Sequence, residues 1–238
     1  MPVRVFDDAS QLAQHTARHI AALLQTKPDA TLCLASGSTP IATFHALVEL
    51  AQTGHANVDQ CTFVGLDEWL GFGPDDQGSC SFYLYRDLFE PLRLRPEQIQ
   101  YFDAKAADLV GECRKIDDFI RSRGGLDLLL VGIGMNGHIA LNEPGTPFTN
   151  YCHVVDLAEM TKEVGQKYFA TPTELNQGIT IGLQHLTEAH EVILMATGKG
   201  KAAVIRQAVQ GPVTEQFPAS IIQQHPKAHV WVDEDANS

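Results

Sequence analysis

The sequence predicts an α/β fold, with an open, mostly parallel sheet and helices on both of its faces. Three observations support this class. Short apolar runs alternate with longer stretches of helical periodicity, as the strands and crossover helices of a parallel sheet do. The chain has 238 residues, 44% of them hydrophobic, which is enough for one full core. No Ser/Gly/Pro-rich linker or repeat divides it, so residues 1–238 are expected to form a single domain.

Five apolar runs have the length and composition of buried strands, and five stretches have the spacing of amphipathic helices. The expected strands are TLCLAS (31–36), CTFVGLD (61–67), LDLLLVGIG (126–134), EVILMATG (191–198) and AHVWVD (228–233). The expected helices span residues 10–25, 41–52, 81–89, 106–123 and 200–209. This is a Rossmann-like arrangement, in which ligands bind at the carboxyl ends of the strands, particularly where the strand order reverses. The turns after the strands are therefore the places to look for a site.

The first such turn is ASGSTP, which contains Ser36, Gly37, Ser38 and Thr39. It precedes a helix that can start at Pro40, a residue suited to the first helical position. The glycine lets the backbone approach a ligand, and the hydroxyls and amides lie where a helix N-terminus attracts anions. Two interpretations stay open: a phosphate-binding turn, or an ordinary turn with Thr39 as the N-cap. The turn matches neither nucleotide fingerprint of this fold class.

The second turn, GLDEW, places two carboxylates directly after an apolar strand. Successive side chains of a strand point to opposite faces, so Asp67 and Glu68 are expected to point in different directions. One of them can enter the cleft while the other makes a cap or a salt bridge. The sequence does not say which.

The third turn belongs to LLLVGIGMNGHIALNEPG, residues 128–145, and is the most informative segment. Its glycines make a backbone-rich loop that presents Asn136, His138 and Glu143 within eight residues. A neutral imidazole can move protons near neutral pH, and a carboxylate held beside it fixes its tautomer. An isolated histidine is usually structural, but one in a glycine loop at a strand end, with an acid nearby, is a candidate catalytic group.

Composition excludes several other functions. The 17 Lys and Arg against 29 Asp and Glu give a net charge of -12, which argues against a nucleic-acid partner. No apolar run approaches the length of a membrane-spanning helix. The five cysteines are an odd number without CxxC pairing, which favours reduced thiols in the cytoplasm over disulfides or a zinc site. HExxH and clustered Cys/His motifs are also missing, so hydrolysis by a bound metal is not expected, and no GxSxG elbow appears either.

The motifs together resemble those of a known family. ASGSTP, FVGLDEW, GIGMNGHIALNEPG and GPVTEQFPAS with HPKAHVWVDE occur in the order found in the glucosamine-6-phosphate deaminase/isomerase family, over residues 31–233. GHIALNEPG is typical of the deaminases, because related 6-phosphogluconolactonases carry a GHTASLFP-like segment there. GLDEW with Trp69, QGSC, GGLDLLL and GITIGL are most similar to the subgroup assigned to galactosamine 6-phosphate.

The resemblance implies the sugar-phosphate isomerase type of fold and a reaction. A hexosamine 6-phosphate, either the galacto or the gluco sugar, becomes a ketohexose 6-phosphate and releases ammonia in amino-sugar catabolism. The resemblance also implies that His138, oriented by Glu143 and Asn136, assists opening of the sugar ring. Asp67 then takes the proton from C2 and delivers it to C1, which requires no cofactor.

The family also implies where the substrate phosphate binds. Its ligands would be Ser36, Gly37, Ser38, Thr39 and Lys201. Where the family usually has an arginine, the alignment places Lys167, which keeps the charge but loses bidentate geometry. Residues that bind an activator in regulated members correspond to His153, Val155 and Asp156, so activation by an acetylated sugar phosphate is not expected.

Two alternatives remain beside the deaminase. The first is a sugar-lactone hydrolase of the same fold, like the 6-phosphogluconolactonases, which would hydrolyse a lactone without releasing ammonia. The second is a non-catalytic sugar-phosphate-sensing domain of a transcription regulator. A sensor would have no need of Asp67, His138 and Glu143 together. The sequence leaves open the sugar's configuration at C4 and whether the chain is a monomer or a homo-oligomer.

Overall fold

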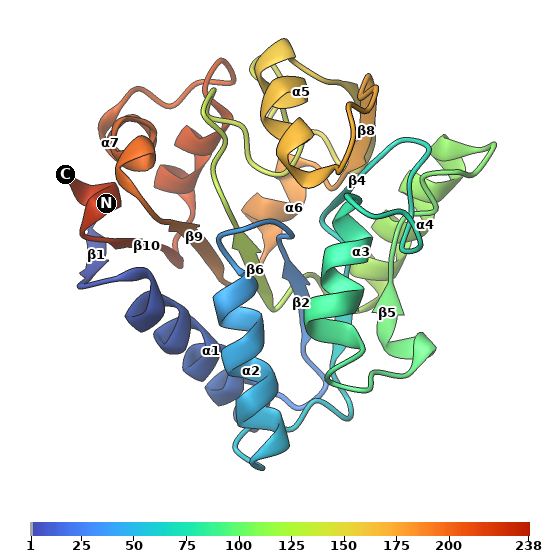
Figure 1. The fold of residues 1–238 in the computed structure, drawn as a ribbon, viewed down its shortest axis with the longest axis vertical. Coiled ribbons are helices and arrows are strands. Elements are labelled where there is room, and N and C mark those ends of the chain that lie inside the picture. Colours follow the sequence, from blue (N-terminus) through green and yellow to red (C-terminus); the bar gives the residue numbers. More distant parts are fainter. Residues whose placement is uncertain (1) are drawn as a thin grey trace.

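The computed structural model describes residues 2–238 and has the predicted α/β architecture (Figure 1). Seven strands form one sheet in the order β1-β10-β9-β6-β2-β3-β5, and every neighbouring pair is parallel. Their bounds are β1 (Val3–Phe6), β2 (Thr31–Leu34), β3 (Thr62–Val64), β5 (Ile99–Gln100), β6 (Leu128–Val131), β9 (Val192–Ala196) and β10 (Ala228–Asp233). All five predicted strands contribute to this sheet, so the predicted fold class is confirmed.

Helices cover both faces of the sheet because the side chains of each strand alternate between two cores. In β2, Leu32 and Leu34 point into one core and Cys33 points into the other. The first core is covered by α1 (Ala9–Thr26), α2 (Ile41–Gln52) and α3 (Cys80–Leu84). The second is covered by α4 (Leu109–Ser122), α6 (Leu183–Glu188) and α7 (Ala202–Gln210). Across residues 2–238, no helix combines the length and apolarity that a membrane crossing requires.

A small antiparallel sheet was not predicted. It has the order β4-β8-β7, with β4 (Asp67–Trp69), β7 (His153–Asp156) and β8 (Gln177–Thr180). Together with α5 (Glu159–Gly165) it lies at one end of the molecule (Figure 1). The run CTFVGLD, expected as one strand, is therefore divided between two sheets. Gly65 lies between the two strands. Only glycine fits at this position, because a Cβ there would lie 2.4 Å from the Tyr101 ring.

Two helices differ from their predicted extents for local reasons. The helix expected over 106–123 begins at Leu109, because the Asp108 carboxylate caps it by accepting the Gly111 amide at 2.8 Å. The helix expected over 81–89 begins at Cys80, where Ser79 is the N-cap, and continues after α3 as a turn of π-helix over Tyr85–Phe89. The other three helices end within two residues of their predicted bounds.

Candidate active site

The strand order reverses between β2 and β6. From β2 the chain proceeds to β3 and β5 on one side, and from β6 to β9 and β10 on the other. A pocket lies at this switch point, as expected for an open α/β sheet. It is lined by residues 35–40 after β2, residues 130–136 at the end of β6 and the turn after it, and Asp67 and His138. The three turns singled out in the sequence thus meet in one pocket.

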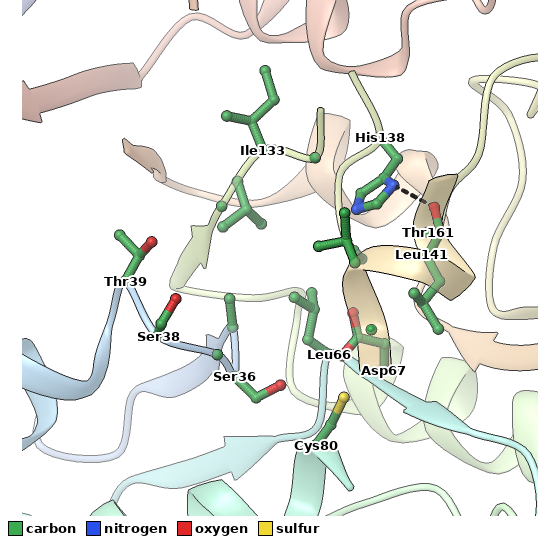
Figure 2. Close-up of a pocket in the computed structure, with 18 of the residues that line it drawn as sticks. Ser36, Ser38, Thr39, Leu66, Asp67, Cys80, Ile133, His138, Leu141 and Thr161 are labelled. Carbon is green, nitrogen blue, oxygen red and sulfur yellow. Dashed lines mark hydrogen bonds between the residues drawn. The ribbon is translucent and has the colours of Figure 1, made fainter. Parts of the chain in front are cut away.

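Figure 2 shows how the side chains divide between two sides of this pocket. Ser38 and Thr39 lie on one side, Asp67 and His138 lie on the other, and Ser36 lies between them with its hydroxyl directed towards Cys80. The hydroxyls of Ser38 and Thr39 and the titratable groups are therefore on opposite sides of the pocket.

The turn after β2 has the features of an anion site. Gly37 has a φ of 114°, a conformation that favours glycine, and a Cβ there would lie 3.0 Å from the Tyr168 hydroxyl. Among residues 2–238, no acceptor is found for the amides of residues 36–39. These free donors precede α2, whose N-terminus adds a positive partial charge. The interpretation as an anion-binding turn is thereby favoured over an ordinary strand-to-helix turn.

Two lysines add positive charge to the same pocket. Lys201 precedes α7 and donates to the carbonyl oxygen of Ile133 at 2.6 Å. Burial and the neighbouring Lys167 lower the pKa of Lys201. Lys167 also lines the pocket, with its ammonium 4.8 Å from the centre of the Tyr168 ring. Both lysines named from the sequence are thus brought together with the turn after β2, and an anion between them would offset their mutual repulsion.

Asp67 and Glu68 point in different directions, as predicted. The Asp67 side chain lines the pocket, whereas the Glu68 carboxylate accepts the amides of Trp69, Cys80 and Ser81 at 2.8–3.0 Å. The pKa of Asp67 is raised to about 7, chiefly by burial and in smaller part by the nearby Glu68, while a hydrogen bond from Cys80 acts to lower it. At neutral pH, Asp67 is therefore divided between its carboxylate and carboxylic acid forms, a state suited to taking up and releasing a proton.

The imidazole of His138 is held from behind and open towards the pocket. Its Nδ1 lies 3.2 Å from the Thr161 hydroxyl and 3.5 Å from a carboxylate oxygen of Glu143. On its other side, a Cβ at Gly134 would lie 2.4 Å from Nε2. Glycine at this position is therefore what allows the loop to pass so close to the ring.

Glu143 lies behind His138 and does not line the pocket. Asn136 donates to Glu143 at 2.7 Å and accepts the backbone amide of His138 at 3.1 Å. Burial acts to raise the pKa of Glu143, but its contacts with His138, Thr161 and Asn136 outweigh burial and hold that pKa below its usual value. An ionised carboxylate at this place favours a proton on Nδ1 of His138, which leaves Nε2 free to act on a ligand.

Sequence reasoning missed Thr161 and Cys80. Thr161 comes from α5, a helix of seven residues that is too short to give a clear periodic pattern. Cys80 lines the pocket next to Asp67 (Figure 2) and lies in QGSC, a segment that carries the family resemblance but by itself indicates no role for the thiol. Both residues reach the site through tertiary packing of segments outside the glycine loop.

Comparison with known proteins agrees with this geometry. Residues 7–231 match the family described as glucosamine-6-phosphate isomerases/6-phosphogluconolactonase. A glucosamine-6-phosphate deaminase of Bacillus pumilus is 38% identical over 239 residues, covering 100% of this chain and 99% of the relative. Glucosamine-6-phosphate deaminase 1 of Bacillus subtilis is 36% identical, covering 100% of this chain and 98% of the relative.

Solved structures give the same picture. A monomeric glucosamine-6-phosphate deaminase superimposes with a TM-score of 0.95 at 36% identity, covering 99% of this chain and 98% of that one. A 6-phosphogluconolactonase of Thermotoga maritima superimposes with a TM-score of 0.75 at 19% identity, covering 98% and 97%, a likeness of fold alone. The fold, the pocket and these full-length matches together show that the chain belongs to the family of glucosamine-6-phosphate isomerases and 6-phosphogluconolactonases.

Proposed function

We propose that the protein is an amino-sugar-phosphate deaminase/isomerase. In this reaction a hexosamine 6-phosphate becomes a ketohexose 6-phosphate and ammonia. One observation carries the proposal: Asp67, which titrates near neutral pH, and His138, backed by Glu143, face an anion-binding turn across a single pocket. The curated relatives at 36–38% identity, which are named glucosamine-6-phosphate deaminases, support the same assignment.

The proposed binding step uses the positively charged side of the pocket. The free amides of residues 36–39 and the ammonium groups of Lys201 and Lys167 hold the phosphate. The sugar then extends towards Asp67 and His138. A tethered phosphate fixes the distance between the reacting carbons and both groups, which favours reaction through proximity.

The proposed chemistry consists of proton transfers. Nε2 of His138 takes the proton of the C1 hydroxyl and passes it to the ring oxygen as the ring opens, which leaves an aldehyde at C1. The Asp67 carboxylate then removes the C2 proton and returns it to C1, while a proton passes from the C2 amine to the C1 oxygen, so that C1 becomes a hydroxymethyl group and C2 an imine. Water adds to that imine and ammonia leaves, which gives the ketone. Asp67 is suited to both halves of the shift because its pKa of about 7 allows it to exchange a proton in either direction.

The lactonase alternative has weaker support. The 6-phosphogluconolactonase structures are 16–19% identical to this chain and therefore share its fold without indicating its reaction. A lactonase requires activation of water but no proton shift between carbons. The isomerase reaction is favoured by the carboxyl group of Asp67, whose pKa is about 7 and which lines the same pocket as the His138 imidazole.

The decisive experiment offers the protein glucosamine 6-phosphate, galactosamine 6-phosphate and 6-phosphogluconolactone in parallel. Ammonia from either amino sugar, with no faster lactone hydrolysis, supports the proposal, and the sugar with the higher kcat/KM identifies the preferred C4 configuration. Asp67→Asn is expected to abolish ammonia release and to stop exchange of the C2 hydrogen in deuterium oxide. Exchange at the normal rate in this variant would reassign the base. Lactone hydrolysis without ammonia would overturn the proposal.

The cytoplasm is the proposed location. All five cysteines are free thiols in the structure, and four of them are buried. Reduced thiols in this number are typical of a reducing compartment.

A further inference from the structure

Three side chains with metal-binding atoms meet outside the pocket, at a place where α4, α6 and the start of β7 come together. They are Asp117 of α4, Cys152 just before β7, and His185 of α6. Their ligand atoms all lie within 4.8 Å of one another. None of the three lines the candidate active site. In sequence they are more than thirty residues apart, so no motif reveals them.

The surroundings hold these groups in a fixed arrangement. His185 is 3% exposed, and its Nε2 lies 2.7 Å from a carboxylate oxygen of Asp117. The same carboxylate oxygen accepts the backbone amide of Cys152 at 3.0 Å. The Tyr151 ring packs edge-on against the His185 imidazole, with 5.0 Å between the two ring centroids. Side chains anchored by such contacts lose little further freedom on binding an ion.

Room for a further ligand lies next to the cluster. Asp117 and His185 line a second cavity, whose wall also includes Gly124, Gly125 and Glu188. The two glycines have no side chains that would fill the cavity. Water entering the cavity can therefore complete a coordination sphere that three protein ligands leave open.

The thiol of Cys152 is not arranged as a nucleophile. A carboxylate oxygen of Asp117 lies 3.0 Å from the Cys152 amide nitrogen, and a negative neighbour disfavours the thiolate. A nucleophilic cysteine needs the opposite environment, with a positive charge or a base that favours the thiolate. A divalent cation would supply that charge, and it would be neutralised by one thiolate and one carboxylate.

We propose that Asp117, Cys152 and His185 form a binding site for a zinc ion. Sulfur, imidazole nitrogen and carboxylate oxygen are the donors that zinc takes in proteins. On binding, the Cys152 thiol releases one proton to solvent. The imidazole proton moves from Nε2 to Nδ1, a nitrogen that no hydrogen bond within residues 2–238 occupies. The Asp117–His185 hydrogen bond is replaced by two bonds to zinc.

The site would fasten three segments together. Zinc would join α4 and α6 to the chain just before β7, and β7 (His153–Asp156) leads to α5, which carries Thr161. The expected role is structural, because no ligand reaches the pocket. A bound ion stabilises the folded chain in proportion to the logarithm of its concentration over its dissociation constant.

The test uses cobalt(II) as a spectroscopic substitute for zinc. The full-length protein, reduced and freed of metal with a chelator, is titrated with CoCl2 alone. We expect one cobalt ion per chain, a thiolate-to-cobalt charge-transfer band in the near ultraviolet, and loss of that band when ZnCl2 is added. The thiolate band separates this site from the surface group of His19, Glu191 and His229, which contains no cysteine.

Variants decide whether the band comes from this cluster. Cys152→Ser is expected to abolish it, and His185→Gln, which keeps a donor for Asp117, to weaken cobalt binding more than about 100-fold, beyond the loss typical of outer-shell partners. Cys61→Ser is the matched control, a buried cysteine in the core on the other face of the sheet. Circular dichroism checks that each variant is folded.

Thermal unfolding provides the second measurement. ZnCl2 is expected to raise the Tm of the unmodified protein and of Cys61→Ser, and to leave that of Cys152→Ser unchanged. The proposal is overturned if no band forms, if the band persists in Cys152→Ser, or if Cys61→Ser loses it as well. Each of these results is independent of deaminase activity, so the zinc site and the proposed function stand or fall separately.

Discussion

At the scale of single residues, the adjacent carboxyl groups of Asp67 and Glu68 lie in different environments: Asp67 lines the pocket, and Glu68 accepts backbone amides. The alternation of a strand predicts that Asp67 and Glu68 diverge, but not which one enters the pocket. The choice depends on the N-terminus of α3, where the amides of Cys80 and Ser81 bind Glu68. That helix end reaches the acidic pair only in the folded chain, so sequence alone left the alternatives equal.

Lys201→Ala tests the phosphate site. Loss of one charge-assisted contact is expected to cost about 1.5–3 kcal/mol, which raises KM for the phosphorylated sugar by about 10- to 150-fold. Trace activity on the unphosphorylated sugar should barely change. Lys199→Ala is the matched control, because its side chain lies in the same turn, is 79% exposed and does not line the pocket. An equal loss on both sugars would show that Lys201 does not bind the phosphate.

Asn136→Asp tests the electrostatics behind His138. Asn136 donates to Glu143 at 2.7 Å, so this variant places a second carboxylate next to the acid that contacts the imidazole. Added negative charge favours the imidazolium, and a larger fraction of His138 is then protonated at a given pH. The acid limb of the kcat/KM profile should move to higher pH while some activity remains. A limb that stays in place or moves to lower pH would mean that it reports another group, such as Asp67.

At the scale of elements, the sequence predicted those that have a continuous apolar run or a repeated helical pattern. The helix over 41–52 and the strand over 228–233 have the predicted bounds, because each repeats its apolar pattern enough times to be recognised. The strands of the small sheet, DEW, HVVD and QGIT, are as short as some strands of the main sheet but mix apolar with charged or polar residues, and α5 has only seven residues. Such elements form through packing of residues such as Trp69 and Leu157 rather than through local pattern. The glycine loop was recognised because its chemistry is contiguous in sequence.

Gly134→Ala tests the fit of that loop around His138. The added methyl would lie 2.4 Å from Nε2, so the imidazole has to move away from its position. We expect kcat to fall by at least about 100-fold, the scale of a misplaced catalytic group, with a smaller change in KM. Gly132→Ala in the same loop is the control, since its methyl would meet nothing within 4 Å. Comparable kcat values for the two variants would show that the ring position is not critical.

At the scale of the whole molecule, the sequence predicts that the turns after the strands share one crevice, and the structure brings them together. The strand order that creates the switch point between β2 and β6 is not visible in the sequence. The same limit applies to Asp117, Cys152 and His185, which only the packing of three separate segments brings together. Contiguous motifs were therefore found, and groupings made by topology were not.

The stability of the molecule should depend on pH through Asp67. Its pKa rises from the ordinary 3.8 to about 7 on folding, so the folded state binds more protons between these values and stability falls as pH rises through about 7. Asp67→Asn removes this penalty. Chemical denaturation should give the two proteins equal free energies of unfolding at about pH 4. At about pH 8 the variant should be more stable, by at most about 4 kcal/mol. If the variant were equally stable or less stable at the higher pH, burial would not disfavour the ionised form of Asp67.

The lengths of the outermost strands have a consequence for how the molecule behaves among its own copies. The main sheet is open, and within residues 2–238 no further strand pairs with the outer side of β1 or β5. β5 has two residues, and β1 has four, with the charged Arg4 stacked on Phe6. Short, charged edges are poor templates for a strand from another chain. The molecule can therefore keep an unclosed sheet at high concentration without joining edge to edge into fibres.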